Sequence, residues 1–520
     1  MLFQHIDLIE GKSMKKRLLE KINLMIRIIE EYCLFTDQSL EDVSSDEIKS
    51  LDELIEIGIV RTKDDLVKLK KIIGNDYDRL VTILSYYSEH KEESGFILKK
   101  FYNSYRTKLQ EEAAQNNADS FYIADFFAGA GGLSLGFVQE GFQVQIANEI
   151  EEVAAETYMF NHPEVDEKRI VQGDIREILD NLENYIDRAV DVVIGGPPCQ
   201  SFSNANRQRI IDDPRNVLYK YFVKAVEIIK PKFVVMENVK GMRSVADQVV
   251  EDFHHIRIDI DGREVDYEMD YHVFNSHDFS VAQGRERLIY IGVRKDIKEE
   301  LGIDANQVIN DIIVGTMNNA RFVLKDALEH IRPLKAAEEK NMTETDHEEY
   351  GKKVEINHYY DLSNDYLDLI NEKRKQPIVY NHKARFNNEN DREIYRRLEQ
   401  GEDSTSERVQ DIMPYKHRSH VFKDKYYKLV EDRPSRTITA HMKMDCHSHI
   451  HPKQVRSLTP REAARVQSFP DDYVFLGPFL KTYMQIGNAV PPLMARGFAK
   501  VIKDYLERVE KEKKELQNTN

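Results

Sequence analysis

The sequence predicts an α/β protein, in which a doubly wound, mainly parallel sheet is accompanied by a smaller irregular domain and an N-terminal helical extension. Short β-branched or aromatic runs, among them FYIADFF, AVDVVIG and PKFVVMENV, alternate with helical patterns between Phe121 and Arg294. This alternation is typical of a mainly parallel sheet that has helices on both faces. The length of 520 residues exceeds the size at which a single core stops growing, so we expect several domains.

The chain divides into four predicted segments. Residues 1–117 form the helical extension, because apolar residues recur there every three or four positions with charges between them. Residues 118–295 carry the strand–helix alternation and form the sheet domain. In residues 296–434 the periodicity weakens and polar, charged and aromatic residues mix, which indicates a separate, less regular domain. Residues 435–520 return to the sheet domain and end in a charged helix.

Composition limits the partners and the compartment. The net charge of −17 (74 minus 91) disfavours non-specific binding to nucleic acid, but a local basic groove can coexist with an acidic exterior, so DNA is not excluded. Three widely spaced cysteines, Cys33, Cys199 and Cys446, predict no disulfide framework and fit a reducing cytoplasm. No apolar run approaches the roughly 18 residues of a membrane span, and the N-terminus lacks the order of a signal peptide. We therefore expect a cytoplasmic protein with no membrane partner.

A glycine turn follows the first strand of the predicted sheet. DFFAGAGG places Gly129, Gly131 and Gly132 where a tight turn and a close ligand need residues without Cβ. Ser134 stands where a dinucleotide fingerprint has its third glycine, which weakens a pyrophosphate site. Glu149 ends the next strand, about where a ribose-binding carboxylate is found. Such a turn is compatible with a plain strand–helix connection, but a nucleoside site without a phosphate requirement favours S-adenosylmethionine over NAD.

A second motif, GGPPCQSFS, ends the fourth predicted strand and contains Cys199. Prolines fix φ and remove backbone donors, so Pro197 and Pro198 hold the next residue in one place. A buried structural cysteine needs no such setting. Glu237 in MENV ends the following strand, and ligands of such sheets bind at the carboxyl ends of strands. The motif therefore predicts a positioned nucleophile beside a carboxylate and the cofactor turn.

Six motifs in order carry a resemblance to a known family. DFFAGAGGLSLGF, GGPPCQSFS, ENV, QGRERLIYIG, SLTPREAARVQSFPDDY and QIGNAVPP resemble the motif set of the cytosine-5 DNA methyltransferases. The resemblance spans roughly Phe121 to Ala499, except for the variable stretch, and leaves the N-terminal helices without a role. It implies methyl transfer from S-adenosylmethionine to carbon 5 of a flipped cytosine in a specific double-stranded DNA sequence. It also implies that residues 118–295 are catalytic and that residues 296–434 recognise the target.

The resemblance implies roles for individual residues. Cys199 would add to ring carbon 6, and Glu237 would bond the ring nitrogen and the exocyclic amine. Arg287, with Arg285, would lie toward the carbonyl side of the base. The predicted cofactor-binding residues are Phe127, Gly129, Gly131, Gly132, Glu149, Ile150, Asp174, Pro198 and Asn488. The predicted DNA-binding residues are Gln200, Ser203, Arg207, Arg209, Gln283 and Arg385.

Alternatives remain at this point. A tRNA cytosine methyltransferase has similar catalytic motifs, but it lacks the large variable region that about 140 residues between IGVR and RPSRT provide here. A non-catalytic DNA-binding protein would not need the set of Cys199, Glu237 and Gln283-x-Arg285-x-Arg287. A zinc deaminase needs a second cysteine after Pro198-Cys199. The segment HMKMDCHSHIHP has one cysteine among scattered histidines, so we expect packing or DNA contact there and no metal.

Partners beyond DNA follow only from the resemblance. Bacterial enzymes of this kind resemble the modifying half of a restriction–modification system, so a cognate restriction endonuclease acting on the same site is a candidate partner. The target sequence and the oligomeric state stay open.

Overall fold

The computed structural model describes residues 2–41, 43, 45–91, 98–115, 120–198, 218–414 and 425–519, with side chains up to residue 515. Its centre is a seven-stranded sheet of order β3-β2-β1-β4-β5-β9-β8. Neighbours from β3 to β5 are parallel, whereas β9 and β8 are added as antiparallel strands. The strands are β1 (Tyr122–Phe126), β2 (Gln143–Glu149), β3 (Ile170–Gln172), β4 (Val192–Gly195), β5 (Phe233–Val239), β8 (Tyr267–Asn275) and β9 (Glu286–Arg294). The predicted doubly wound, mainly parallel sheet is confirmed.

Side chains of the central strands alternate between two apolar layers. Ile123 of β1 packs into one layer and Ala124 into the other, as the two-residue period of a strand requires. The first layer lies under α7 (Gly132–Gln139), α13 (Ala305–Thr316) and α19 (Pro492–Thr519). The second lies under α9 (Ile175–Leu179), α10 (Leu218–Ile229) and α11 (Ala246–His254). Strands buried on both faces explain the nearly continuous apolar runs of the sequence.

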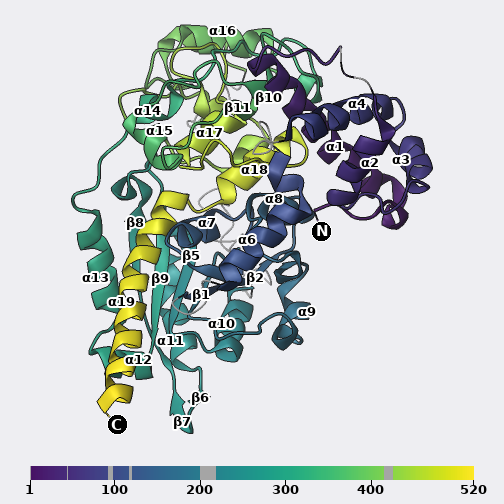
Figure 1. Cartoon of the computed structure of the whole chain (residues 1–520). Helices are drawn as coiled ribbons and strands as arrows, with labels where there is room; N and C mark the ends of the chain where they lie inside the picture. Colours follow the sequence, from purple (N-terminus) through teal and green to yellow (C-terminus); the bar gives the residue numbers. More distant parts are fainter. Residues whose placement is uncertain are drawn as a thin grey trace.

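The described residues from 323 to 489, called the second lobe here, lie above the sheet in Figure 1. Their two-stranded antiparallel sheet joins β10 (Gly351–Ile356) to β11 (Ile378–Lys383). The helices around it are α14 (Leu324–Leu328), α15 (Asp365–Ile370), α16 (Glu389–Arg397), α17 (Pro460–Val466) and α18 (Phe479–Asn488). The apolar core continues from the sheet domain into this lobe through residues such as Phe469 and Tyr483.

The structure draws two segment limits differently from the sequence pattern. Helices α12 (Lys295–Leu301) and α13 pack against β8, β9 and α19, so residues 295–316 adjoin the sheet domain. Helices α17 and α18 belong to the second lobe, because α17 packs against β11 and α14. Hydrophobic periodicity predicts where helices form, but it does not predict which domain a helix packs against. A small hairpin, β6 (Ile258–Ile260) and β7 (Arg263–Val265), projects beside α11.

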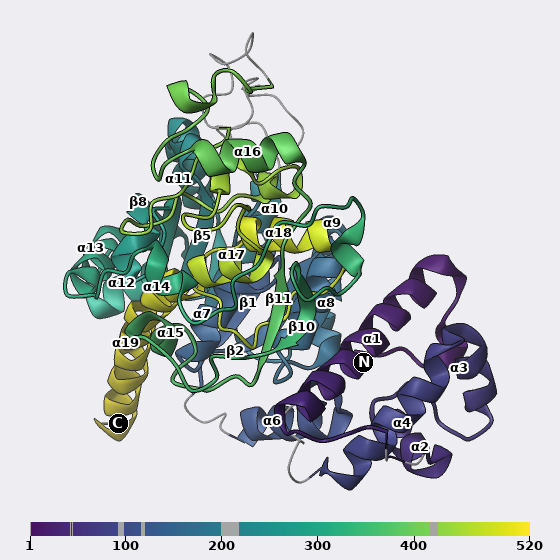
Figure 2. The same cartoon turned by 90° about the horizontal axis from the view of Figure 1, so that it is seen from above.

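The described residues from 2 to 115 form a bundle of helices, the N-terminal bundle, which Figure 2 shows beside the rest of the chain. Its helices are α1 (Gly11–Phe35), α2 (Glu47–Glu56), α3 (Asp65–Ile73), α4 (Asp76–Glu89) and α6 (Asn103–Gln115). Leu18, Ile22, Met25 and Ile29 share one buried face of α1, as their spacing predicts. Among the described residues, no helix combines the length and the apolar composition that a bilayer crossing requires.

Candidate active site

The glycine turn between β1 and α7 has a left-handed backbone. Phe127, Gly129 and Gly131 have φ values of 60°, 57° and 88°, and a non-glycine residue seldom adopts such values. A Cβ on Gly132 would lie 2.5 Å from the carbonyl oxygen of Val490. The turn therefore needs glycine both for its conformation and for the close approach of the chain that follows α18.

Glu149 spans the mouth of this turn. Its Oε2 accepts a hydrogen bond from the amide of Gly129 at 2.8 Å, and its Oε1 accepts one from the amide of Glu151 at 2.7 Å. Burial raises the pKa of Glu149. Ile150, the next residue, is 59% exposed although it is apolar. A carboxylate and an exposed apolar side chain therefore lie together at the end of β2, as a nucleoside site requires.

Asp174 follows β3 at the same edge of the sheet. Its Oδ1 accepts from the amide of Arg176 at 3.0 Å and caps α9. The guanidinium of Arg176 also bonds this carboxylate, with Nε 2.9 Å from Oδ1, and this contact lowers the pKa of Asp174. The described partners of Asp174 are thus its own helix terminus and Arg176, and a ligand would share the carboxylate with them.

The buried carboxyl of Asp125, which the sequence analysis missed, links the two elements that flank the glycine turn. Oδ2 of Asp125 accepts from the Ser134 hydroxyl at 2.6 Å, and Ser134 accepts in turn from the Tyr158 hydroxyl at 2.8 Å. Burial raises the pKa of Asp125 to about 7. Ser134, which stands where a dinucleotide fingerprint has glycine, therefore ties α7 to β1. The available signal was a charged residue inside the apolar run YIADFF.

The Gly-Pro turn after β4 lies against two side chains of β5. The carboxylate of Glu237 is so close that a Cβ on Gly196 would lie 3.0 Å from its Oε2. Nδ2 of Asn238 donates to the carbonyl of Pro197 at 3.0 Å. Nε of Arg287 lies 2.7 Å from Oε1 of Glu237, and both side chains are largely buried. Burial lowers the pKa of Arg287, and the Glu237 carboxylate opposes that shift.

These two turns are adjacent, because Phe126 at the end of β1 pairs with Gly195 at the end of β4. The sequence model of the C-5 cytosine-specific DNA methylase family matches residues 121–504, which include both turns. The chain belongs to this family. As a member, the protein is a DNA (cytosine-5)-methyltransferase.

Relatives and a solved structure agree with this membership. Type II methyltransferase M1.HphI of Haemophilus parahaemolyticus is 32% identical over 393 residues, which cover 74% of this chain and 87% of the relative. Type II methyltransferase M.Sau96I of Staphylococcus aureus is 28% identical, with 80% and 84% covered. A solved prophage-encoded protein of E. coli, described as a DNA modification methyltransferase, is 25% identical with a TM-score of 0.54. That likeness covers 74% of this chain and 99% of the other.

Several residues that the methyltransferase motifs single out lie outside the described residues. These are Cys199, Gln200, Ser203, Arg207 and Arg209. Pro198, the residue before Cys199, is described and exposed. The roles assigned to this segment therefore stay predictions, and the geometry around them is that of Gly196, Pro197 and Glu237.

Two side chains of the methyltransferase motif QGRER, those of Gln283 and Arg285, are buried against other parts of the protein. The guanidinium of Arg285 donates to the carbonyls of Ile438, Gly487 and Ala489 at 2.6, 2.9 and 3.0 Å. Gln283 donates to Oε1 of Gln467 at 2.7 Å. The expectation that Arg285 reaches the base and that Gln283 contacts DNA therefore needs correction. Gln283, Arg285 and Arg287 are spaced two residues apart, so the sequence pattern treats them alike. The pattern does not reveal that residues between 438 and 489 cover Gln283 and Arg285.

Two further predicted residues lie farther along the methyltransferase chain. Asn488 ends α18 and is exposed, two residues before the carbonyl of Val490 that touches the glycine turn. Arg385, predicted to bind DNA, donates to the carbonyl of Met442 at 2.9 Å and to Sγ of Cys446 at 3.2 Å. In this position Arg385, two residues after β11, is bonded to the segment HMKMDC, so its described contacts are internal.

Proposed function

We propose that the protein methylates carbon 5 of a cytosine in a specific double-stranded DNA sequence, with S-adenosylmethionine as methyl donor and Cys199 as nucleophile. The observation that carries this proposal is the adjacency of two turns. Phe126 and Gly195 are paired neighbours, so the glycine turn and the Gly-Pro turn leave the sheet side by side. A donor held by the first turn and a base held at the second would meet at this edge.

The residues at the glycine turn fit the cofactor. The Glu149 carboxylate offers acceptors for ribose hydroxyls, the exposed Ile150 offers an apolar surface for adenine, and the Cβ position of Gly129 has open space. Phe127, Asp174, Pro198 and Asn488 are proposed to complete the site. When bound, S-adenosylmethionine supplies an electrophilic methyl group.

The chemistry follows from the residues around Pro198. Cytosine is a poor carbon nucleophile, so Sγ of Cys199 would first add to ring carbon 6, which makes carbon 5 electron-rich. Glu237 would bond the ring nitrogen and favour its protonation as the sulfur adds. Arg287, 2.7 Å from Glu237, would hold that carboxylate in place. After methylation, loss of the proton on carbon 5 restores the double bond and expels the thiolate of Cys199.

DNA is favoured over tRNA as the substrate because of the second lobe. A flipped cytosine, whose extrusion costs a few kcal/mol, carries no information about its neighbours. Selectivity must therefore come from elsewhere, and the irregular residues 323–434 supply polar and cationic side chains for reading bases and phosphates. The names of the type II relatives support a modification enzyme of a restriction–modification system, with a restriction endonuclease acting on the same sequence as its partner.

The test traps the covalent adduct. A duplex that carries 5-fluorocytosine at the target retains the adduct, because fluorine cannot leave as a proton does. Wild-type protein should form an adduct that survives denaturation only when S-adenosylmethionine is present, and Cys199→Ala should form none. Cys33→Ala is the matched control, since that thiol is buried in the N-terminal bundle. Methyl transfer by Cys199→Ala at the wild-type rate would refute the mechanism.

A further inference from the structure

The N-terminal bundle precedes the matched family region, yet it is attached to both of the other parts of the molecule. Helix α1 lies along α8 (Glu152–Asn161) of the sheet domain and along β10 of the second lobe, as Figure 2 shows. Helix α8 begins three residues after Glu149. The last three residues of strand β11, which pairs with β10, are the first three of the stretch NHKARFNNENDREIYRR that the sequence predicts to read bases. The bundle therefore touches one element of the cofactor edge and one of the recognition segment.

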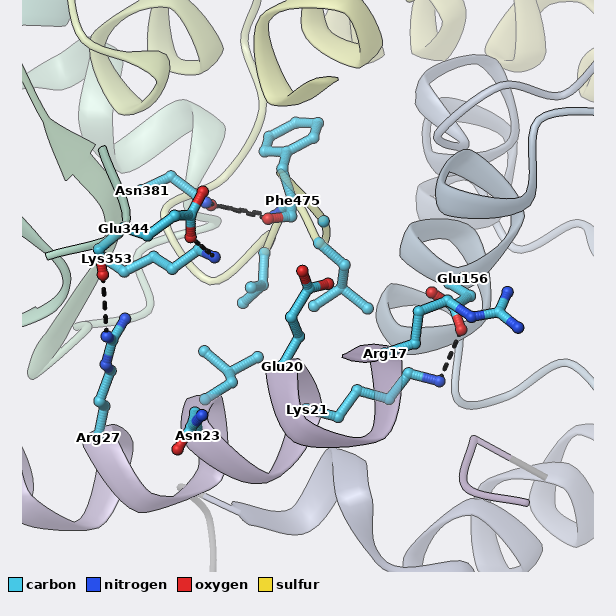
Figure 3. Close-up of a pocket in the computed structure, with 14 residues that line it drawn as sticks. Arg17, Glu20, Lys21, Asn23, Arg27, Glu156, Glu344, Lys353, Asn381 and Phe475 are labelled. Carbon is cyan, nitrogen blue, oxygen red and sulfur yellow. Dashed lines mark hydrogen bonds and ion pairs between the residues drawn. The ribbon is translucent and has the colours of Figure 1, made fainter. Parts of the chain in front are cut away.

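The joint with the sheet domain combines ion pairs and buried hydrogen bonds with the packing of Phe101 on Phe160 of α8. Nζ of Lys21 lies 2.7 Å from Oε1 of Glu156, and Arg17 forms an ion pair with Glu152. Figure 3 shows the Lys21 contact. Both terminal nitrogens of Arg106 donate to the carbonyl of Met159 at 3.1 Å. These contacts lie along α8, so the bundle holds the helix that follows the Glu149 loop.

The joint with the second lobe centres on Glu31, which is 7% exposed. Its Oε2 accepts from the amide of Ile356, the last residue of β10, at 2.9 Å. Its Oε1 lies 3.1 Å from Nζ of Lys352 on the same strand. One turn earlier on α1, Nε of Arg27 lies 3.1 Å from Oδ2 of Asp346. A single face of α1 therefore contacts β10, and Asp346 before it, through charged groups.

The three parts enclose a cavity of about 170 Å³ (Figure 3). Side chains from α1, from α8 and from the second lobe line it, among them Arg17, Glu156 and Lys353. Apolar packing also joins the three parts, because Phe160 of α8 and Val354 and Ile378 of the second lobe belong to the buried apolar cluster of the N-terminal bundle. The ion pairs and hydrogen bonds on either side of the cavity act in addition to this packing.

We propose that the N-terminal bundle is a brace that sets the position of β10 and β11 relative to α8, and that Glu31 is a positioning residue for methylation. The proposal rests on the proposed function, in which one duplex must contact the recognition segment and the Glu237 site at the same time. If the brace loosens, only a fraction of molecules hold the recognition segment and the Glu237 site in the relative position that one duplex can contact. The apparent affinity for DNA then falls by that fraction, while the bound complex reacts as before.

The experiment compares Glu31→Ala with Glu30→Ala in the full chain. Glu30 is the neighbouring carboxylate on α1, but it pairs with Arg79 of α4 inside the bundle, at 2.6 Å from Nε. Both changes remove one charge from α1, and only the first opens the joint to β10. Glu31→Ala should raise KM for target DNA about tenfold, with kcat and the affinity for S-adenosylmethionine within about twofold of wild type. Glu30→Ala should leave all three constants within that range.

Hydrogen exchange provides a readout that does not depend on activity. Amides of β10 and β11 should exchange faster in Glu31→Ala than in Glu30→Ala, and this comparison tests the brace even if the wild-type protein transfers no methyl group. Should Glu31→Ala fail to fold, Arg27→Ala opens the same joint at a more exposed position. Equal KM values for the two variants, or a loss of kcat and cofactor affinity together, would overturn the assignment.

Discussion

The buried carboxyl of Asp125 should make the sheet domain less stable at alkaline pH, and Asp125→Asn should remove that dependence. Asp125 is fully buried, and burial raises its pKa from 3.8 to about 7. Below about pH 4 the carboxyl is protonated in both the folded and the unfolded state. As the pH rises toward 7, the unfolded chain releases this proton and the folded protein keeps it, so stability declines. Above the folded pKa the loss is complete.

The size of the effect follows from the difference between the two pKa values. Each pKa unit corresponds to about 1.4 kcal/mol, so roughly three units amount to about 4 kcal/mol between acidic and alkaline pH. Asparagine has a similar shape, can accept the Ser134 hydrogen bond, and carries no charge at any pH. Its NH2 group, which replaces the second carboxyl oxygen, adds a cost that does not depend on pH. The free energy of unfolding of Asp125→Asn, relative to wild type, should therefore rise by about 4 kcal/mol from pH 4 to pH 8.

The assay is urea unfolding at several pH values, followed by hydrogen exchange in β1 and α7. Ser134→Ala is the informative companion, because the Ser134 hydrogen bond lowers the pKa of Asp125 and opposes the effect of burial. Its stability should continue to fall to a higher pH, and by a larger total amount, than that of wild type. A constant difference between Asp125→Asn and wild type across this range would refute the reasoning.

Two further predictions concern the cofactor and the target. Glu149→Ala should weaken S-adenosylmethionine binding by about 1–3 kcal/mol, the cost of losing hydrogen bonds to a charged group, and unchanged affinity by calorimetry would remove Glu149 from the site. Replacing residues 323–434 with the matching segment of a relative of known, different target should move methylation to the relative's sequence. Bisulfite sequencing of DNA from cells that express the chimera checks this, and an active chimera that keeps the original site would contradict the assignment.

The sequence predicted the sheet because its strands are apolar runs between turns. It placed Glu149 and Glu237 at strand ends, and the structure has Glu149 as the last residue of β2 and Glu237 two residues before the end of β5. The sequence could not tell the buried Arg285 from Arg287, which contacts Glu237, because the two arginines are two residues apart near the start of the same strand. The segment that buries Arg285, around residues 438 and 487–489, lies far away in the sequence. Asp125 was missed for a related reason, because its partner Ser134 was noticed only as a departure from a fingerprint. The attachment of α1 to β10 depends on packing between segments more than 300 residues apart, as Glu31 and Ile356 illustrate. Helical periodicity carries no such information.

The position of α19 has a consequence for the order in which the protein acquires its structure during synthesis. This helix covers α7 and packs against α13, so a segment that is synthesised long after β1 completes the apolar layer that begins at β1. Until then, Phe137 and its neighbours lack their main covering helix, and the carbonyl of Val490 is not yet beside Gly132. Contacts across such a long stretch of chain form late and slowly. A ribosome-bound chain therefore carries an incomplete cofactor turn, and a truncated product would expose apolar surface.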